Sequence, residues 1–148
     1  MAYNVFDIAN KILAKPYSSD TEELVSNLKL QKLLYYEQGF HLAYYGTPLF
    51  DDDIEAWMNG PVVPVILETF KCYKNGGIEY SGDTITLTLN KEEQLFNEVY
   101  TVYGKYSATG LMDLAYQEMP WSTTKTGVGS IIPREKMIEY FKGRLKRE

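Results

Sequence analysis

Four acidic residues form the densest cluster of ionisable side chains in the chain: Asp51, Asp52, Asp53 and Glu55. Clustered carboxylates hold Mg²⁺ or Ca²⁺ in many proteins. An EF-hand loop needs alternating ligands, a glycine at its sixth position and a glutamate at its twelfth, and this run lacks that register. We therefore expect an exposed acidic loop or a partner contact. A metal site, or an enzyme that uses these carboxylates, stays an open alternative.

The chain has one histidine, His41, and one cysteine, Cys72. A zinc site of Cys and His ligands needs four of them and a disulfide needs two cysteines, so one chain can build neither. A Ser–His or Cys–His mechanism would have to use His41, but we expect this residue to be packed and hydrogen-bonded in an apolar helix. Cys72 is expected to be a small, half-buried hydrophobic residue. Because no phosphate loop or dinucleotide fingerprint is present either, we expect no catalytic residue, no metal and no cofactor.

A second unusual segment combines tryptophan, glycine and two prolines over residues 56–64 (Ala-Trp-Met-Asn-Gly-Pro-Val-Val-Pro). Its first interpretation is a rigid corner whose tryptophan fills part of the core. Rigid aromatic side chains and proline-fixed backbone also bind partners at a low entropic cost. We therefore regard Trp57, Asn59 and Pro61 as candidate partner-binding residues, and we treat Trp121, which also follows a proline, in the same way.

Apolar residues at helical spacing dominate the chain. The strongest helix prediction covers residues 26–45, with Ser26 as its N-cap and a stop at Gly46. This segment is apolar nearly all round, which is typical of a central helix, and Gly39 in its middle indicates the close approach of a neighbouring element. The other helices are expected over residues 4–15, 61–74, 90–104 with an N-cap at Asn90, 107–118, and from Pro133 onward.

A small β-hairpin is expected between two of these helices. Residues 84–89 (Thr-Ile-Thr-Leu-Thr-Leu) contain an alternation of period two, and residues 78–80 precede them across a Ser-Gly-Asp turn. The sequence therefore predicts a mainly α fold: a compact single domain over residues 1–148, with about six helices and one small β-hairpin.

The net charge of −5 is unevenly distributed. Residues 134–148 hold six basic and three acidic side chains, a net +3, so the rest of the chain carries −8. An acidic body argues against general nucleic-acid binding, although a DNA-binding repressor that uses the basic tail stays open. No apolar run approaches the roughly 18 residues that cross a bilayer, and the first residues lack the basic region of a signal peptide. Together with the single cysteine, these features predict a cytoplasmic protein without membrane contact.

Several blocks of the sequence resemble one family: residues 28–39 (Leu-Lys-Leu-Gln-Lys-Leu-Leu-Tyr-Tyr-Glu-Gln-Gly), 46–51, 54–64, 103–111, 118–121 and 138–141. The chain resembles the SocA-like antitoxin family, also called the Panacea domain, many members of which are labelled phage-associated GepA proteins. The family often has Thr-His where Ala115-Tyr116 stands here. A role that needs this histidine is therefore not expected, whereas Tyr116 can fill its space and keep a polar tip.

The resemblance implies a mostly helical domain without catalysis, an antitoxin that neutralises a cognate protein toxin encoded nearby by direct binding. One branch of the family is similar to a proteolytic adaptor, so delivery of the toxin to a AAA+ protease is the alternative. An acidic surface would complement the positive sites of toxins that act on RNA or nucleotides. The residues that we expect to touch the partner are Asp51, Asp52, Asp53, Glu55, Trp57, Asn59, Pro61, Tyr116 and Trp121.

Overall fold

The computed structural model describes residues 2–18, 23–80 and 87–145 of the chain. This part contains seven α-helices, two short 3-10 helices and one two-stranded antiparallel sheet, which confirms a mainly α fold with a small hairpin. The α-helices are α1 (Val5–Leu13), α2 (Asn27–Tyr45), α3 (Pro64–Thr69), α4 (Glu93–Tyr103), α5 (Ala108–Tyr116), α6 (Met119–Ser122) and α7 (Arg134–Lys142). The strands are β1 (Glu55–Trp57) and β2 (Gly60–Val62), and the 3-10 helices are Lys15–Ser18 and Lys71–Tyr73.

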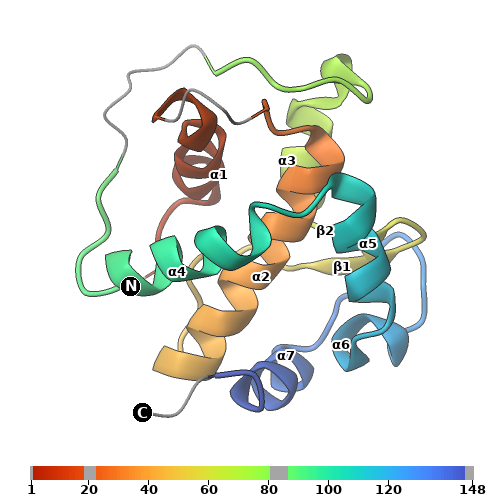
Figure 1. Ribbon diagram of the computed structural model, residues 1–148. Coiled ribbons are helices and arrows are strands. Elements are labelled where there is room, and N and C mark those ends of the chain that lie inside the picture. The colour runs from red at the N-terminus through yellow and green to blue at the C-terminus, as the bar shows by residue number, and fades with distance from the viewer. Residues whose placement is uncertain (1, 19–22, 81–86, 146–148) are drawn as a thin grey trace.

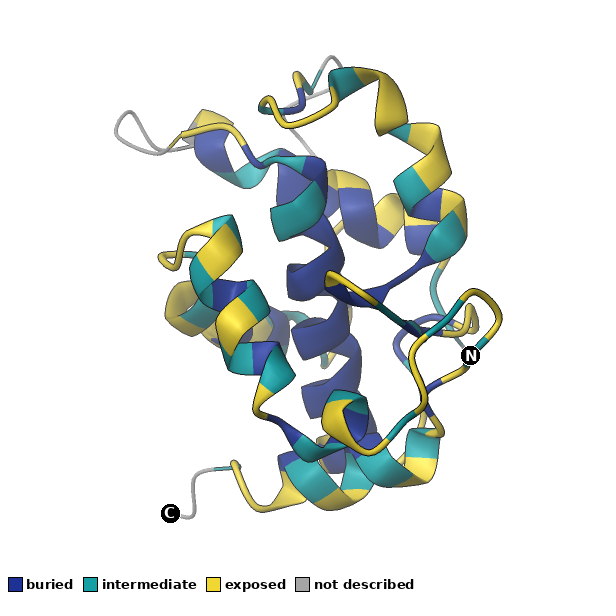
Figure 2. Ribbon diagram, turned by 90° about the vertical axis from the view of Figure 1, so that its right-hand side faces the viewer, coloured by how far each residue is buried: buried dark blue, intermediate teal, exposed yellow. Residues whose placement is uncertain are grey.

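Helix α2 runs through the middle of the molecule, with α1 on one side and the hairpin, α5 and α6 on the other (Figure 1). Every residue from position 30 to position 43 is buried, whereas the surrounding helices bury only part of their surface (Figure 2). The Ser26 side chain accepts a hydrogen bond from the backbone N–H of Lys29, and Gly46 ends the helix at a φ of 77°, where glycine is favoured. The predicted central helix and both of its end signals are therefore confirmed.

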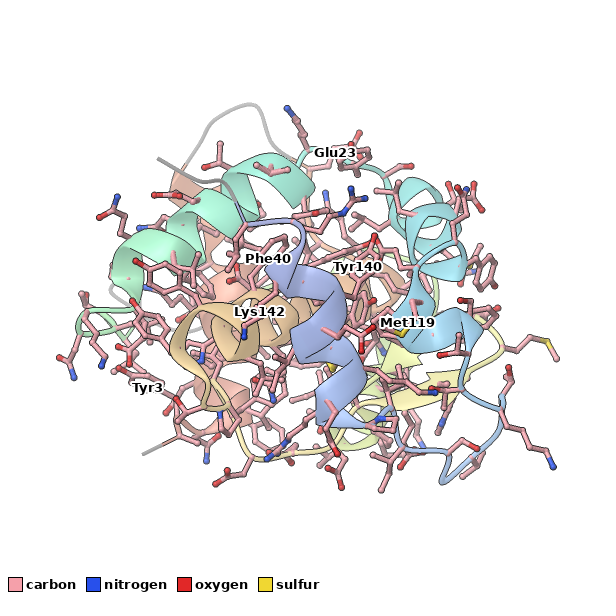
Figure 3. The ribbon with its side chains drawn as sticks, turned by 90° about the horizontal axis from the view of Figure 1, so that it is seen from below. Tyr3, Glu23, Phe40, Met119, Tyr140 and Lys142 are labelled. Carbon is pink, nitrogen blue, oxygen red and sulfur yellow. The ribbon has the colours of Figure 1, made fainter. Side chains whose placement is uncertain are left out.

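Gly39 marks the point where α7 comes closest to α2. A Cβ atom on Gly39 would lie 2.2 Å from the Cε2 atom of Phe141, so only glycine leaves room for this ring. Figure 3 shows α7 lying across α2 at this contact. The packing of the ring against the bare backbone offsets the helix propensity that glycine loses, about 1 kcal/mol relative to alanine.

The hairpin lies at a different place from the predicted one. β1 and β2 are joined by a tight turn at Met58 and Asn59. Of the predicted hairpin, residues 81–86 lie outside the described residues, and its described ends, residues 78–80 and 87–89, form no strand. Each of these two ends instead buries one apolar side chain in the core. Of the alternating pattern, only residues 87–89 are described, and Leu89 anchors them in the core.

The predicted N-cap of α4 was wrong. Asn90 does not cap the helix, which begins only at Glu93. The carboxylate of Glu93 instead accepts a hydrogen bond of 2.8 Å from the backbone N–H of Leu89. The Glu93 side chain therefore fixes the segment that leads into α4. The sequence pattern had predicted this role for Asn90 and Glu93 together.

The helix predicted over residues 61–74 is also shorter in the structure. It begins at Pro64, because the residues before it form β2, and it continues after Thr69 as the 3-10 turn Lys71–Tyr73. Cys72 lies in this turn and is exposed, so its expected half-buried position was wrong. In the described part of the chain, no helix is long and apolar enough to span a membrane.

Candidate partner-binding site

Polar side chains of α2 point inside the protein and hold the segment that follows the hairpin. The Gln31 side-chain oxygen accepts a hydrogen bond of 2.8 Å from the backbone N–H of Val63. The ammonium group of Lys32 donates to the carbonyl of Pro61 at 3.2 Å. Both bonds are buried, and leaving such groups unpaired costs about 1–3 kcal/mol each. They therefore fix the end of the hairpin to the central helix.

Lys32 lies directly beneath the hairpin turn. Gly60, the first residue of β2, has a φ of 105°, and a Cβ atom there would lie 2.6 Å from the Cε atom of Lys32. Burial lowers the pKa of Lys32 from 10.5 to about 7, because the ammonium group loses its water. The turn can close over this lysine because residue 60 is a glycine.

Glu118 holds the corner between α5 and α6 against the same helix. Its side chain is 5% exposed. The hydroxyl of Tyr35 donates to its Oε1 atom at 3.0 Å, and the hydroxyl of Tyr36 lies 3.1 and 3.0 Å from its two carboxyl oxygens. Burial raises the pKa of Glu118 from 4.5 to about 7, and the two tyrosine hydroxyls oppose this rise. The corner is thus attached to α2 by a buried polar cluster.

Trp57, Tyr116 and Trp121 meet where the hairpin joins this corner. The indole N–H of Trp121 donates to the carbonyl of Trp57 at 2.9 Å, and the hydroxyl of Tyr116 donates to the carbonyl of Met58 at 2.6 Å. The rings of Tyr116 and Trp121 have centroids 4.7 Å apart. All three aromatic side chains are half-buried, so each keeps an accessible edge, while the polar atoms of Tyr116 and Trp121 hold the backbone of the hairpin.

Glu55 belongs to this junction and not to the acidic loop. Its Oε1 atom accepts hydrogen bonds from the indole N–H of Trp57 at 2.8 Å and from the backbone N–H of Gly129 at 2.7 Å. The loop after α6 also pairs with the free edge of β1, as its place beside the hairpin in Figure 1 shows. Met58 and Val128 stand on these two supported segments and are 78% and 85% exposed. We call the surface of Trp57, Met58, Tyr116, Trp121 and Val128 the aromatic tip.

Asp51, Asp52 and Asp53 form a separate area. All three are exposed and lie at the end of β1 away from the turn. The guanidinium group of Arg134 donates to the backbone carbonyl of Asp51 at 2.7 Å, which leaves the carboxylates of the loop to solvent. Among the described residues, no group of three or more His, Cys, Asp or Glu side chains is arranged to hold a metal ion. The predicted partner-binding residues therefore divide into an acidic loop and a tip.

The last two predicted residues differ in their exposure. Asn59 is exposed in the hairpin turn beside Met58, so it extends the aromatic tip. Pro61 is buried, and its carbonyl group is bound by Lys32. Pro61 therefore supports the aromatic tip from below and is not part of its exposed surface.

The chain is similar to known proteins. Residues 30–122 match the family described as Antitoxin SocA-like, Panacea domain. The chain belongs to this family. It is 30% identical over 138 residues to Antitoxin SocA of Caulobacter vibrioides (strain NA1000 / CB15N), a match that covers 83% of this chain and 71% of that protein. No solved structure gives a significant match. Membership indicates an antitoxin role.

The matched region of this Panacea domain contains every residue of the aromatic tip except Val128. Residues 30–122 include the buried part of α2, both strands, α5 and α6. The hydroxyl of Tyr116 donates to the carbonyl of Met58 in the hairpin turn.

His41 is a packed residue in this Panacea domain, as the sequence predicted. Its Nδ1 atom lies 2.6 Å from the carbonyl of Thr47, and its side chain is buried. Burial lowers its pKa below 6.5. The imidazole lies near the C-terminal end of α2, far along the helix from Lys32, and thus plays no part in the tip.

Sequence reasoning missed the residues that position the tip. Lys32, Tyr35, Tyr36 and Glu118 were interpreted as parts of helices or of the core. A signal was present, because a helix that is apolar nearly all round nonetheless carries Gln31 and Lys32 next to each other in its buried stretch. Buried polar groups are almost always hydrogen-bonded, so each of them requires a partner elsewhere in the chain.

Proposed function

We propose that this chain is an antitoxin that neutralises a cognate protein toxin by binding it directly through the aromatic tip. One observation carries the proposal: Met58 and Val128 are 78% and 85% exposed on backbone that hydrogen bonds from Tyr116 and to Glu55 hold in place. Large apolar side chains on a fixed backbone lose little entropy on association. Methionine, tyrosine and tryptophan are also enriched at protein interfaces.

The acidic loop supports a second part of the same proposal. Asp51, Asp52 and Asp53 project three carboxylates from a chain whose first 133 residues carry a net charge of −8. Exposed charges steer diffusional encounter more than they hold a formed complex. The loop therefore speeds association with a toxin whose active surface is basic, while the tip sets the lifetime of the complex.

The test is co-expression with the product of the adjacent reading frame, first in a growth assay and then in a binding measurement with the purified proteins. The double substitution Met58→Asp/Val128→Asp should abolish rescue of growth and weaken binding by at least about tenfold, the effect of roughly 1.4 kcal/mol. Val102→Asp is the matched control, because Val102 is 48% exposed on α4, away from the tip.

Other results of these experiments also test the proposal. A neighbouring product that is harmless alone, or that forms no complex with the wild-type protein, contradicts the proposal. Rescue of growth accompanied by a shortened toxin half-life that depends on a AAA+ protease would replace direct sequestration with protease delivery. Asp52→Asn should slow association mainly at low salt, because salt screens charges at a distance.

A further inference from the structure

Glu118 lies in the chain between two residues of the aromatic tip, Tyr116 and Trp121. It follows Tyr116 by two residues and precedes Trp121 by three. Its backbone carbonyl accepts the first hydrogen bond of α6, from the backbone N–H of Ser122 at 3.0 Å. Tyr116 and Trp121 both lie within three residues of Glu118. A shift of Glu118 would therefore also move the backbone that carries these two aromatic residues.

The carboxyl group of Glu118 faces hydroxyl groups on three helices and one cation. Burial raises the pKa of every tyrosine in this cluster above 10, and the guanidinium group stays charged. Glu118 is therefore the member of the cluster that gains and loses a proton near neutral pH. The groups that face it are Tyr35 and Tyr36 from α2, Tyr103 from α4, Tyr140 from α7, and Arg144, which lies 5.3 Å from the Tyr140 ring beyond the end of α7.

We propose that protonation of Glu118 switches the orientation of Tyr116 and Trp121 at the aromatic tip. The ionised carboxylate is an acceptor only, and the hydroxyls of Tyr35 and Tyr36 both donate to it. Once protonated, the carboxyl group has a proton of its own to donate. It still accepts from the phenols, but it has lost its charge, so both tyrosine hydrogen bonds weaken and the new O–H requires an acceptor within the cluster. This changes how the corner sits on α2.

Both tryptophans of the chain, Trp57 and Trp121, lie at the tip, so their two indole N–H signals in an NMR spectrum report on this surface alone. We expect the Trp121 signal of the wild-type protein to shift with a midpoint near pH 7 in a titration from about pH 5 to about pH 9. Glu118→Gln should remove this titration. An unchanging wild-type signal, or a midpoint that persists in Glu118→Gln, overturns the proposal.

Three further variants separate Glu118 from the other buried groups. Lys32 also titrates near pH 7 and lies under the hairpin, but Lys32→Met should leave the Trp121 midpoint in place. Glu37→Gln, which changes a buried glutamate elsewhere on α2, should leave it in place as well. Tyr36→Phe removes a donor to the ionised carboxylate and should raise the midpoint by about one pH unit. If Glu118→Gln does not fold, the wild-type titration and Tyr36→Phe decide the question.

The proposal rests on the proposed function only where toxin binding is concerned, and the two can fail separately. A titrating Trp121 signal in a protein that does not neutralise the adjacent gene product leaves the switch standing and removes the antitoxin proposal. Neutralisation without any titration does the reverse. If both hold, the affinity of the wild-type protein for that product should change between about pH 6 and about pH 8, and the affinity of Glu118→Gln should change less.

Discussion

Helix α2 has two buried sides, and each of them contains one glutamate in a different situation. On the side of the hairpin, Glu118 is 5% exposed and is bound by the hydroxyls of Tyr35 and Tyr36. On the side of α1 and α4, Glu37 is 3% exposed, and its Oε2 atom has no hydrogen-bond partner among the described residues. Both carboxyl oxygens of Glu118 thus accept hydrogen bonds, whereas the Oε2 atom of Glu37 accepts none among the described residues.

Two lysines lie near Glu37. Burial raises the pKa of Glu37 well above its ordinary value, and Lys15 and Lys11 of the α1 region oppose the rise. Lys11 itself pairs with Glu93 of α4 at 3.0 Å. On this side, the two lysines offset part of the cost of burying the Glu37 carboxyl group.

The comparison shows where the protein uses specific polar geometry. On the hairpin side, buried hydrogen bonds set the position of exposed side chains at the aromatic tip. On the α1 and α4 side, apolar packing and the pair between Lys11 and Glu93 hold the helices together, while the Oε2 atom of Glu37 has no hydrogen-bond partner among the described residues. An isolated buried polar group is tolerated where nothing depends on its exact orientation.

The largest effect is expected from Glu118→Ala. This substitution leaves the hydroxyls of Tyr35 and Tyr36 buried without their acceptor and should lower the free energy of unfolding by about 3 kcal/mol. The raised pKa of Glu118 means that the folded protein binds a proton more tightly than the unfolded chain, so wild-type stability falls as pH rises from about 4.5 to about 7. The loss should therefore be larger at pH 5 than at pH 8. Urea unfolding at the two pH values measures it, and an equal loss at both contradicts the assigned pKa.

Lys32→Met should have a smaller effect of the opposite sign. The folded pKa of Lys32 is about 7, below its ordinary 10.5, so the wild-type protein gains stability as pH rises from about 7 to about 10.5. Methionine removes the cost of burying the ammonium group but leaves the carbonyl of Pro61 without its donor. We expect a gain of about 2 kcal/mol at pH 6 that shrinks by about the same amount toward pH 9. Thermal unfolding across this range measures the gain, and a gain that grows with pH would show that the ammonium group is stabilised in place.

The central helix could be predicted from the sequence because its signals are local. Ser26, Gly46 and the apolar run between them lie within one segment, and each acts on its own neighbours. The position of the hairpin could not be predicted in this way. Its strands are three residues long, and the edge of β1 is completed by the loop at residues 127–131, which is about 70 positions away.

The candidate site was predicted in parts but not as a whole. Trp57 and Trp121 attract attention as rare aromatic residues beside prolines, yet nothing near them in the sequence indicates that they bind each other. Tyr35 and Glu118 are 83 positions apart, and their hydrogen bond exists only in the folded chain. Residue type indicated which side chains were unusual, whereas long-range packing decided which of them meet.

The smallest effect is expected on the other side of α2, from Glu37→Gln. The carboxyl group of Glu37 has a raised folded pKa because burial disfavours its charged form, so it destabilises the native protein increasingly as pH rises above its ordinary value of 4.5. The neutral amide has the same shape and never ionises, so the variant should match the wild-type protein near pH 5 and be more stable than it near pH 9. Paired urea unfolding curves at these two pH values test this. Because Glu37 does not touch the hairpin or the α5–α6 corner, its variant should also leave toxin binding unchanged. A change in toxin binding would mean that the two sides of α2 are coupled through the helix, and the contrast between them would then no longer hold.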